Sequence, residues 1–443
     1  MTVSGDSLLS APMSATVRAE VRYDRIVGTD YQNLSDRFIL KEAKDYGIQF
    51  YHVYRVRFNC MKPYVERSIR ESALGEDASI RSLSHLSDGN SKPCCVIGTL
   101  YKLQKKKPNI LRELEGEVEE SSPLNSDFTS EDDQLILEDE DQRVKLIGKI
   151  ATTHLVTGLV LGVYGKHKDG KLDVEQVFFP RSERIKRYIP LRNMYIAFIS
   201  NIQVSHDSSQ VLENLQLAMD WLTGFEGCPR DQEENASIER LVVAGGLLGK
   251  ECSKKGGGDE DIFESVRLLE NALLQLVKSI KVDIIPGQSD ELSNASMPQQ
   301  PLHKCLFPRA AAYASTFQTV TNPYFFQIEG TKIYGSSGKN VEDIVRNSSL
   351  KDPLQVMEEI LKWGHISPTS PDTLGCFPYK DKDPFVMEFL PHVLFSAIHG
   401  KEHLSKFTNN TLLFTIPNFS TSGSLVLLNL KDLSTKEIKF STN

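Results

Sequence analysis

The chain has 443 residues, of which 40% are hydrophobic and 25% charged, and its formal net charge is −8 at pH 7. These values predict a globular protein of two or three domains, and no apolar run approaches the roughly 20 residues that cross a bilayer. The negative charge disfavours a chain-wide electrostatic grip on nucleic acid but leaves room for a local basic patch.

The cysteines and the N-terminus indicate the cellular compartment in which the protein is expected. Seven cysteines without C-x-x-C spacing predict reduced thiols, as in a cytosolic or nuclear protein. The N-terminus lacks a basic start followed by an apolar stretch, so we expect no secretory signal. We expect no membrane partner.

The first part of the chain is predicted to be rich in strands. Residues 1–43 are polar and weakly periodic, which predicts a mobile tail leading into a short helix. Residues 44–182 are predicted to form a small β-barrel, because several short strands carry internal glycines that permit sharp coiling. The predicted strands are 51–61, 93–103, 142–150 and a hairpin over 154–180, in which Asp169-Gly170 supplies a tight turn.

Two insertions interrupt this predicted barrel. Residues 68–91 are rich in serine and are predicted to be loose, whereas residues 113–141 contain thirteen Asp or Glu and no Lys or Arg. Such a run repels itself and phosphate alike, so we expect a solvated loop. The alternative is an acidic edge that faces a basic partner protein. Residues 183–193 are predicted to be a linker.

The second part, 194–443, alternates between strands and helices. Strands are predicted at 194–200, 240–246 and 281–287. A helix with apolar positions Val211 to Leu222 is expected to end at Gly224, and another is expected to begin after Asp352 and to end at Gly364. This pattern predicts an α/β sandwich whose loops cluster at the carboxyl ends of its strands, where such folds place their chemistry.

Several phrases in the second part are highly specific. They are "MPQQPLHKCLFPRAAAYASTFQTVTNPY" (297–324), "GSSGKNVEDIVRNSS" (335–349) and "HISPTSPDTLGCFPY" (365–379), together with "LILEDEDQRVKLIG" (135–148) and "LVTGLVLGVYG" (155–165) in the predicted barrel. With these phrases the chain closely resembles the small, B-family accessory subunits of DNA polymerase delta from about residue 44 to its end. The resemblance implies a mixed β and α/β fold: an OB-fold β-barrel followed by a calcineurin-like metallophosphoesterase α/β sandwich.

Active phosphoesterases of that fold hold two metal ions with loops that carry D-x-H, G-D, G-N-H-D/E, a lone His and G-H-x-H. Two dications need carboxylates and imidazoles to offset their charge and activate a water. The matching positions here carry amides, a hydroxyl and small or apolar side chains, which offer no such charge. The degenerate ligand positions are Asn201, Gln203, Gly246, Gln288, Ser289, Ala397, Ile398 and Gly400. We therefore expect no catalytic residue, no metal and no cofactor.

Three alternatives remain open at this point. A single metal could use three of the scattered ligand-type residues, which are Asp207, Asp290, His206, His365 and His399. The chain could instead be a divergent metal-dependent phosphodiesterase or 3′–5′ exonuclease. It could also be a single-strand DNA-binding OB protein, because tyrosines and lysines occur in the predicted barrel.

The resemblance favours a non-catalytic scaffold in DNA replication and repair, located in the nucleus. It implies as partners the C-terminal metal or iron–sulfur module of the polymerase catalytic subunit, a third subunit and, indirectly, the sliding clamp. DNA contact is expected to be weak or indirect. Candidate partner-binding residues are Phe307, Tyr324, Phe325, Phe326, Phe377 and Tyr379, for which packing inside the chain is the alternative role.

Overall fold

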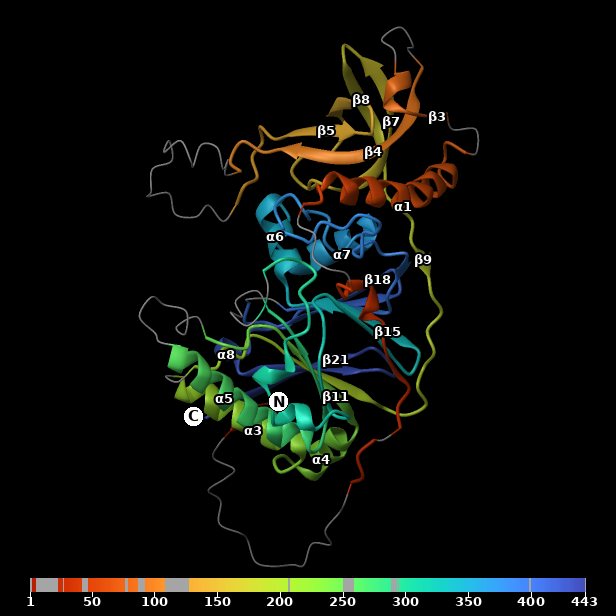
Figure 1. The fold of residues 1–443 in the computed structure, drawn as a ribbon. Coiled ribbons are helices and arrows are strands. Elements are labelled where there is room, and N and C mark those ends of the chain that lie inside the picture. The colour runs from red at the N-terminus through yellow and green to blue at the C-terminus, as the bar shows by residue number, and fades with distance from the viewer. Residues whose placement is uncertain are drawn as a thin grey trace, which may run out of the picture. The chain divides into compact units, whose positions relative to one another are not determined.

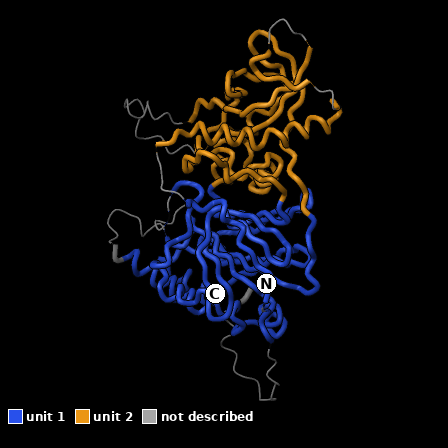
Figure 2. Tube along the Cα trace, turned by 45° about the vertical axis from the view of Figure 1, so that its right-hand side comes forward, with its two compact units in different colours: residues 1–41, 186–339, 391–443 blue, residues 42–185, 340–390 orange. Residues whose placement is uncertain are grey.

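The structure is a computed structural model, and it divides the chain into two units (Figure 2). Unit 1 comprises Met1–Lys41, Lys186–Lys339 and Pro391–Asn443, and unit 2 comprises Glu42–Ile185 and Asn340–Leu390. The residues that the structure describes are 2–4, 23–26, 28–41, 47–75, 79–86, 92–107, 127–205, 208–249, 259–287, 293, 295–397 and 400–442.

Unit 2 contains a closed β-barrel (Figure 1). The sheet has the order β3-β4-β5-β6-β8-β7, and β4 also pairs with β7, which closes the ring. The five barrel strands therefore follow the 1-2-3-5-4-1 order of an OB fold. The strands are β3 (Ile80–Arg81), β4 (Cys94–Leu103), β5 (Gln134–Glu138), β6 (Arg143–Gly148), β7 (Val160–Lys168) and β8 (Lys171–Phe178).

Local sequence signals explain two features of the barrel. Asp169 and Gly170 have φ angles of 52° and 69° between β7 and β8, so the predicted tight hairpin turn is confirmed. In β4, a Cβ on Gly98 would lie 2.7 Å from the carbonyl oxygen of Glu138. Only glycine allows β4 and β5 to approach this closely.

The segment predicted as a strand at 51–61 is instead part of helix α1 (Tyr51–Arg70). The buried positions in α1 recur every fourth residue, at Val53, Arg57, Met61, Val65 and Ile69. That spacing places them on one helical face, against the barrel. The alternation in 51–58 was therefore misleading, because its apolar residues also satisfy the helical period.

A buried guanidinium ties α1 to other parts of unit 2. The Arg57 side chain is fully buried, and its Nε lies 2.6 Å from Oδ2 of Asp383. Burial alone would raise the pKa of Asp383, but the charges of Arg57 and His365 outweigh it and hold that pKa well below its usual range. Arg57 also donates to three loop carbonyls: Gly158 (3.0 Å), Pro368 (2.8 Å) and Ser370 (2.6 Å).

Residues 340–390 contribute helices and loops to unit 2. Helix α7 (Pro353–Trp363) begins after Asp352, whose carboxylate accepts from Leu354 N at 3.0 Å, and ends at left-handed Gly364. Both predicted ends of this helix are confirmed. The other elements are α6 (Lys339–Asn347), which starts at the last residue of unit 1, β9 (Glu183–Arg184), β16 (Phe389–Leu390) and the 3₁₀ helix η3 (Leu83–His85).

Unit 1 is a sandwich of two mixed sheets with helices outside. One sheet has the order β1-β21-β20-β10-β11-β12-β13 and the other β18-β19-β17-β15-β14-β2. The first sheet uses β1 (Thr2–Ser4), β10 (Tyr195–Ile199), β11 (Ile238–Ala244), β12 (Lys281–Ile285), β13 (Phe317–Thr319), β20 (Ser424–Asn429) and β21 (Thr435–Ser441). The second uses β2 (Tyr31–Asn33), β14 (Tyr324–Ile328), β15 (Thr331–Ser336), β17 (Val393–Ala397), β18 (Ser405–Thr408) and β19 (Thr411–Ile416).

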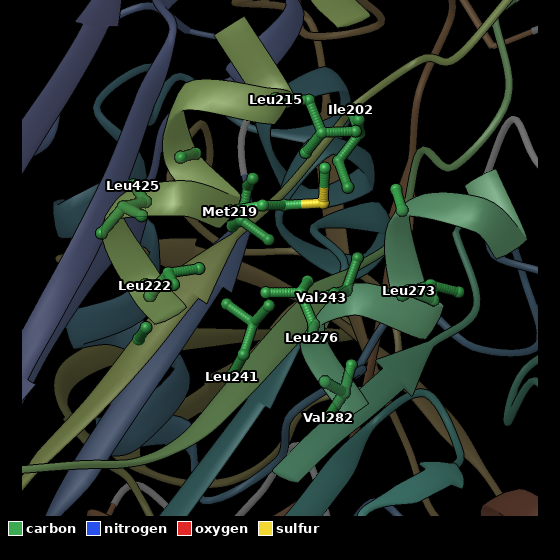
Figure 3. Close-up of a cluster of buried hydrophobic side chains, with 14 of the residues drawn as sticks. Ile202, Leu215, Met219, Leu222, Leu241, Val243, Leu273, Leu276, Val282 and Leu425 are labelled. Carbon is green, nitrogen blue, oxygen red and sulfur yellow. The ribbon is translucent and has the colours of Figure 1, made fainter. Parts of the chain in front are cut away.

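Two long helices cover the first sheet. Figure 3 shows side chains of α3 (Ser209–Thr223) and α5 (Asp259–Val277) directed at those of β11 and β12. The predicted end of α3 at Gly224, which has a φ of 87°, is confirmed. The remaining helices are α4 (Pro229–Ala236), α8 (Phe419–Ser422) and the 3₁₀ helices η2 (Ser35–Phe38), η5 (Lys304–Leu306) and η6 (Ala310–Ala312). Among the described helices, none has the length and apolar character that a membrane span requires.

A buried polar network holds the N-terminal strand β2 in unit 1. Asp283 is fully buried, pairs with Arg240 and accepts from Tyr324 Oη at 2.7 Å. The hydroxyl oxygen of Tyr31, on β2, lies 2.8 Å from the hydroxyl oxygen of Tyr324. The Arg240 guanidinium lies 3.8 Å from the centre of the Tyr31 ring. Residues 28–41 therefore belong to the sandwich, rather than to the predicted mobile tail.

The predicted segment boundaries differ from the observed ones elsewhere too. Residues 340–390 of the predicted second domain, 194–443, belong to unit 2 instead, where the ion pair of Arg57 and Asp383 joins them to α1. In the predicted loose insertion 68–91, residues 80–81 and 83–85 form β3 and η3, while 76–78 and 87–91 lie outside the described residues. Residues 113–126 of the predicted acidic insertion 113–141 also lie outside them, whereas its residues 134–138 form the barrel strand β5 instead of a loop. The predicted linker 183–193 begins with β9, which pairs with β16.

Substitution of Arg57 should strongly destabilise unit 2. Arg57→Met removes the guanidinium that neutralises the buried Asp383, which keeps only His365 as a charged neighbour, and it removes the donors to three carbonyls. We therefore expect the free energy of unfolding to fall by about 3–5 kcal/mol. Urea denaturation followed by circular dichroism measures this. Arg55→Met is the matched control, because the Arg55 side chain is 58% exposed. Equal unfolding midpoints for the two variants would contradict the assigned role of Arg57.

Candidate functional site

The candidate site lies at the carboxyl ends of β10, β11 and β12 in unit 1. These strands are parallel neighbours, so their following loops meet at one edge of the sheet. Of the eight predicted ligand positions, Asn201, Gln203, Gly246, Ala397 and Gly400 are described. Gln288, Ser289 and Ile398 lie outside the described residues.

The loops after β10 and β11 are joined through their main chains. Asn201 N donates to Gly245 O at 2.9 Å, and Gln203 N donates to Gly246 O at 2.8 Å. Asn201 and Gln203 adopt left-handed φ angles of 49° and 55°, an uncommon conformation in which Asn is enriched. The two loops therefore continue the pairing of the strands past their ends.

Gly246 has no room for a side chain. Its φ is +63°, and a Cβ placed on it would lie 2.2 Å from Asn201 Oδ1 and 2.6 Å from Asn201 Cα. The second of these atoms belongs to the main chain, so a rotamer change cannot relieve the clash. The resemblance puts the bridging aspartate of active relatives at this position, and here the neighbouring loop takes up the space that its side chain would need.

The neighbouring strand ends are packed in the same way. A Cβ on Gly245 would lie 2.7 Å from Gly287 Cα and 2.8 Å from Ser337 Cβ. On the second sheet, Ala397 ends β17 and is buried, and its carbonyl oxygen would lie 2.1 Å from a Cβ on Gly338. Gly400 O accepts from Asn418 N at 2.9 Å. Ala397 and Gly400 thus contribute main-chain packing.

Neutral amides occupy the space beside these glycines. Asn322 Nδ2 lies 2.6 Å from both Gln299 Oε1 and Ser337 Oγ, and Gln299 Nε2 donates to Gly287 O at 2.9 Å. The Gln299 and Asn322 main chains also pair with each other, at 2.8 and 3.0 Å. Sequence reasoning missed this cluster, although both amides stand beside prolines in the 297–324 phrase.

This arrangement offers little to a pair of divalent ions. Amide and hydroxyl oxygens can contact a metal, but none of the side chains placed here carries the negative charge that offsets two dications. In the part of the chain that the structure describes, no group of three or more His, Cys, Asp or Glu is arranged to hold a metal. The described residues therefore fit a metal pair poorly.

One of the five residues considered for a single-metal site, His365, has other partners. His365 is buried in unit 2, with Nε2 3.0 Å from Oδ2 of Asp383, the carboxylate that Arg57 neutralises. It thus belongs to the buried ion cluster around Arg57. The other four residues considered for such a site, which are His206, Asp207, Asp290 and His399, lie outside the described residues.

The six aromatic residues considered as partner-facing are buried. Phe307 and Phe317 pack edge to face at 5.9 Å, and the rings of Tyr324 and Phe326 stack at 4.4 Å. Each of the six rings fills the interior, so none presents its face to a partner, and their exposed fractions are at most 8%: Phe307, Tyr324, Phe325, Phe326, Phe377 and Tyr379. The predicted binding role is corrected to packing, which burial of apolar area favours.

Comparison with known proteins finds family models for two successive parts of the chain. The family model for the B subunits of DNA polymerases alpha and epsilon matches residues 196–403, and that for the OB-fold domain of DNA polymerase delta subunits matches residues 49–177. The DNA polymerase delta small subunit of Oryza sativa subsp. japonica is 35% identical over 94% of this chain and 98% of that protein. DNA polymerase delta subunit 2 of Drosophila melanogaster is 33% identical over 94% and 98%. Among solved structures, a dimetal phosphatase from Danio rerio is similar with a TM-score of 0.28 and 11% identity, covering 56% of this chain and 99% of that one.

Restoring a carboxylate at Gly246 should damage the fold without creating a metal site. Gly246→Asp must displace Asn201, so we expect a loss of about 3 kcal/mol or more in the free energy of unfolding. Gly170→Asp is the matched control: its φ is +69°, but nothing lies within 4 Å of a Cβ there, so only the left-handed backbone cost of about 1–2 kcal/mol is expected. Chemical denaturation of both variants checks this. A Gly246→Asp variant as stable as the control would refute the close packing.

Proposed function

The chain belongs to the DNA polymerase delta small-subunit family, and we propose that it serves that polymerase as a scaffold without chemistry of its own. In this role it binds the C-terminal metal or iron–sulfur module of the catalytic subunit together with a further subunit, which connects to the sliding clamp. Its place of action is the nucleus, where DNA replication and repair occur.

The observation that carries the non-catalytic part of this proposal is the clash at Gly246. An active site of the calcineurin-like type needs a bridging carboxylate at the end of β11, and a Cβ there would lie 2.2 Å from Asn201 Oδ1. Main-chain hydrogen bonds fix Asn201 in that place. Opening the space would therefore require the loops after β10 and β11 to separate.

The barrel surface is better suited to binding a protein than to binding DNA. OB barrels that bind single strands combine aromatic rings with a positively charged groove along strands 2 and 3. Here these are β5 and β6, and the turn between them carries Asp139, Glu140 and Asp141 directly after Glu138. Carboxylates at that position repel phosphate, so DNA contact by this face is weak.

Co-expression tests the scaffold role. The full chain and the C-terminal module of the catalytic subunit should elute from gel filtration as one complex, and the complex should persist at roughly 0.5 M salt, where exposed charge pairs are screened. An unrelated OB-fold protein carried through the same procedure is the control for adventitious association. Separate elution of the two folded proteins would contradict the proposed role.

A further inference from the structure

Unit 2 contains a groove that the scaffold role does not explain. It has a volume of about 710 Å³ and runs between the first two turns of α1 and the outer face of β4 and β5. Four aromatic rings line it: Tyr51, Tyr54 and Phe58 come from α1, and Tyr101 comes from β4. Tyr51 is 54% exposed.

The aromatic rings come together for simple geometric reasons. Positions 51, 54 and 58 are three and four residues apart, so in a helix they share one face. On β4, Tyr101 pairs with Ile136 of β5. From Gly98 onward, buried and less buried positions alternate along β4, and Tyr101 is one of the less buried positions, so its side chain points away from the barrel interior. The groove is thus walled by rings on two sides.

The charge lining the groove is predominantly negative. It consists of four carboxylates, from Glu138, Asp139, Glu140 and Asp372, against the single guanidinium of Arg55. Arg55 pairs with Glu140 at 3.2 Å, but both side chains are more than half exposed, so a competing cation can replace this pair at little cost.

The other carboxylates also have partners within unit 2. Glu138 lies 3.4 Å from Arg143, which is 73% exposed, and Asp372 lies 2.6 Å from Lys107. Asp139 accepts hydrogen bonds from the main-chain N–H groups of Leu83, Asp141 and Gln142. These bonds fix the carboxylates at the rim of the groove and leave its negative charge only partly offset.

In an adjoining hollow the charges are more nearly balanced. It has a volume of about 500 Å³ and shares Phe58, Asp139 and Glu140 with the groove, and its further charged residues are Lys62, Arg70, Arg81, Glu66 and Asp141. At its border the Lys62 ammonium already lies 5.6 Å from the centre of the Phe58 ring. The rings of this region therefore accept cations from the chain itself.

From this combination we infer that the groove is a docking site for an extended protein segment that carries Lys or Arg side chains. A guanidinium or ammonium group gains from aromatic faces and from carboxylates at once, whereas a nucleic-acid backbone would meet repulsion from the same carboxylates. Residues 138–140, which line the groove, belong to the acidic stretch 113–141. In this inference, that part of the acidic stretch forms the edge that faces a basic partner.

Fluorescence anisotropy of the full chain tests the site, with a labelled eight-residue peptide of alternating Arg and Tyr as the probe. Glu140→Lys should weaken binding roughly tenfold and Tyr51→Ala roughly fivefold, because each removes one kind of contact. Glu175→Lys makes the same charge change at an exposed residue of β8 away from the groove, and Tyr188→Ala removes a similarly exposed ring in unit 1. Both controls should bind like the parent chain.

Three results would overturn the assignment. Equal weakening by Glu140→Lys and Glu175→Lys would show that only the overall charge attracts the peptide. Unchanged binding by Tyr51→Ala would remove the aromatic wall from the site. Labelled oligothymidylate that binds the parent chain and is lost in Tyr51→Ala would make the groove a nucleic-acid site. Co-elution with the catalytic subunit's module is measured separately, so failure here leaves the scaffold role standing.

Discussion

The contact between the main chains after β10 and β11 is the constraint on which the functional account depends. Asn201 and Gln203 donate to the carbonyls of Gly245 and Gly246, and this pairing brings Asn201 Cα within 2.6 Å of where a Cβ of Gly246 would stand. A metal site needs the opposite arrangement, with loops held apart and charged side chains directed into the space between them. The strand ends are thus part of the packed interior.

The fold does not depend on a metal site at these strand ends, because apolar packing elsewhere holds the sandwich together. Apolar side chains of α3 and α5 pack on β11 and β12, and a second apolar layer fills the space between the two sheets. Unit 2 has its own core beneath α1 and its own buried ion cluster around Arg57. Such rigid bodies offer surfaces on which partners can be held, and the acidic aromatic groove beside α1 is one of them.

The sequence predicted features that depend on a few neighbouring residues and missed those that depend on distant ones. The turn at Asp169-Gly170 and the ends of α3 and α7 follow from local rules of backbone conformation and capping. Segment 51–61 was misassigned because its apolar residues fit both the strand period and the helical period. Its packing on the barrel, which the local sequence does not contain, selects the helix. At the candidate site, the lack of charged ligands at Asn201, Gln203 and Gly246 was visible in the sequence. The amide cluster of Gln299 and Asn322, and the burial of Tyr324 and Phe326, depend on tertiary contacts that no local pattern contains.

The most direct test of the central claim is a metal and turnover measurement on the full chain. The protein would be stripped with a chelator, exchanged into Mn²⁺, separated from free ion and analysed by inductively coupled plasma mass spectrometry, while hydrolysis of bis(p-nitrophenyl) phosphate is followed in parallel. The account predicts far less than one equivalent of retained manganese and a hydrolysis rate equal to that of buffer with Mn²⁺. Close to two equivalents of manganese, accompanied by turnover that EDTA abolishes, would contradict it.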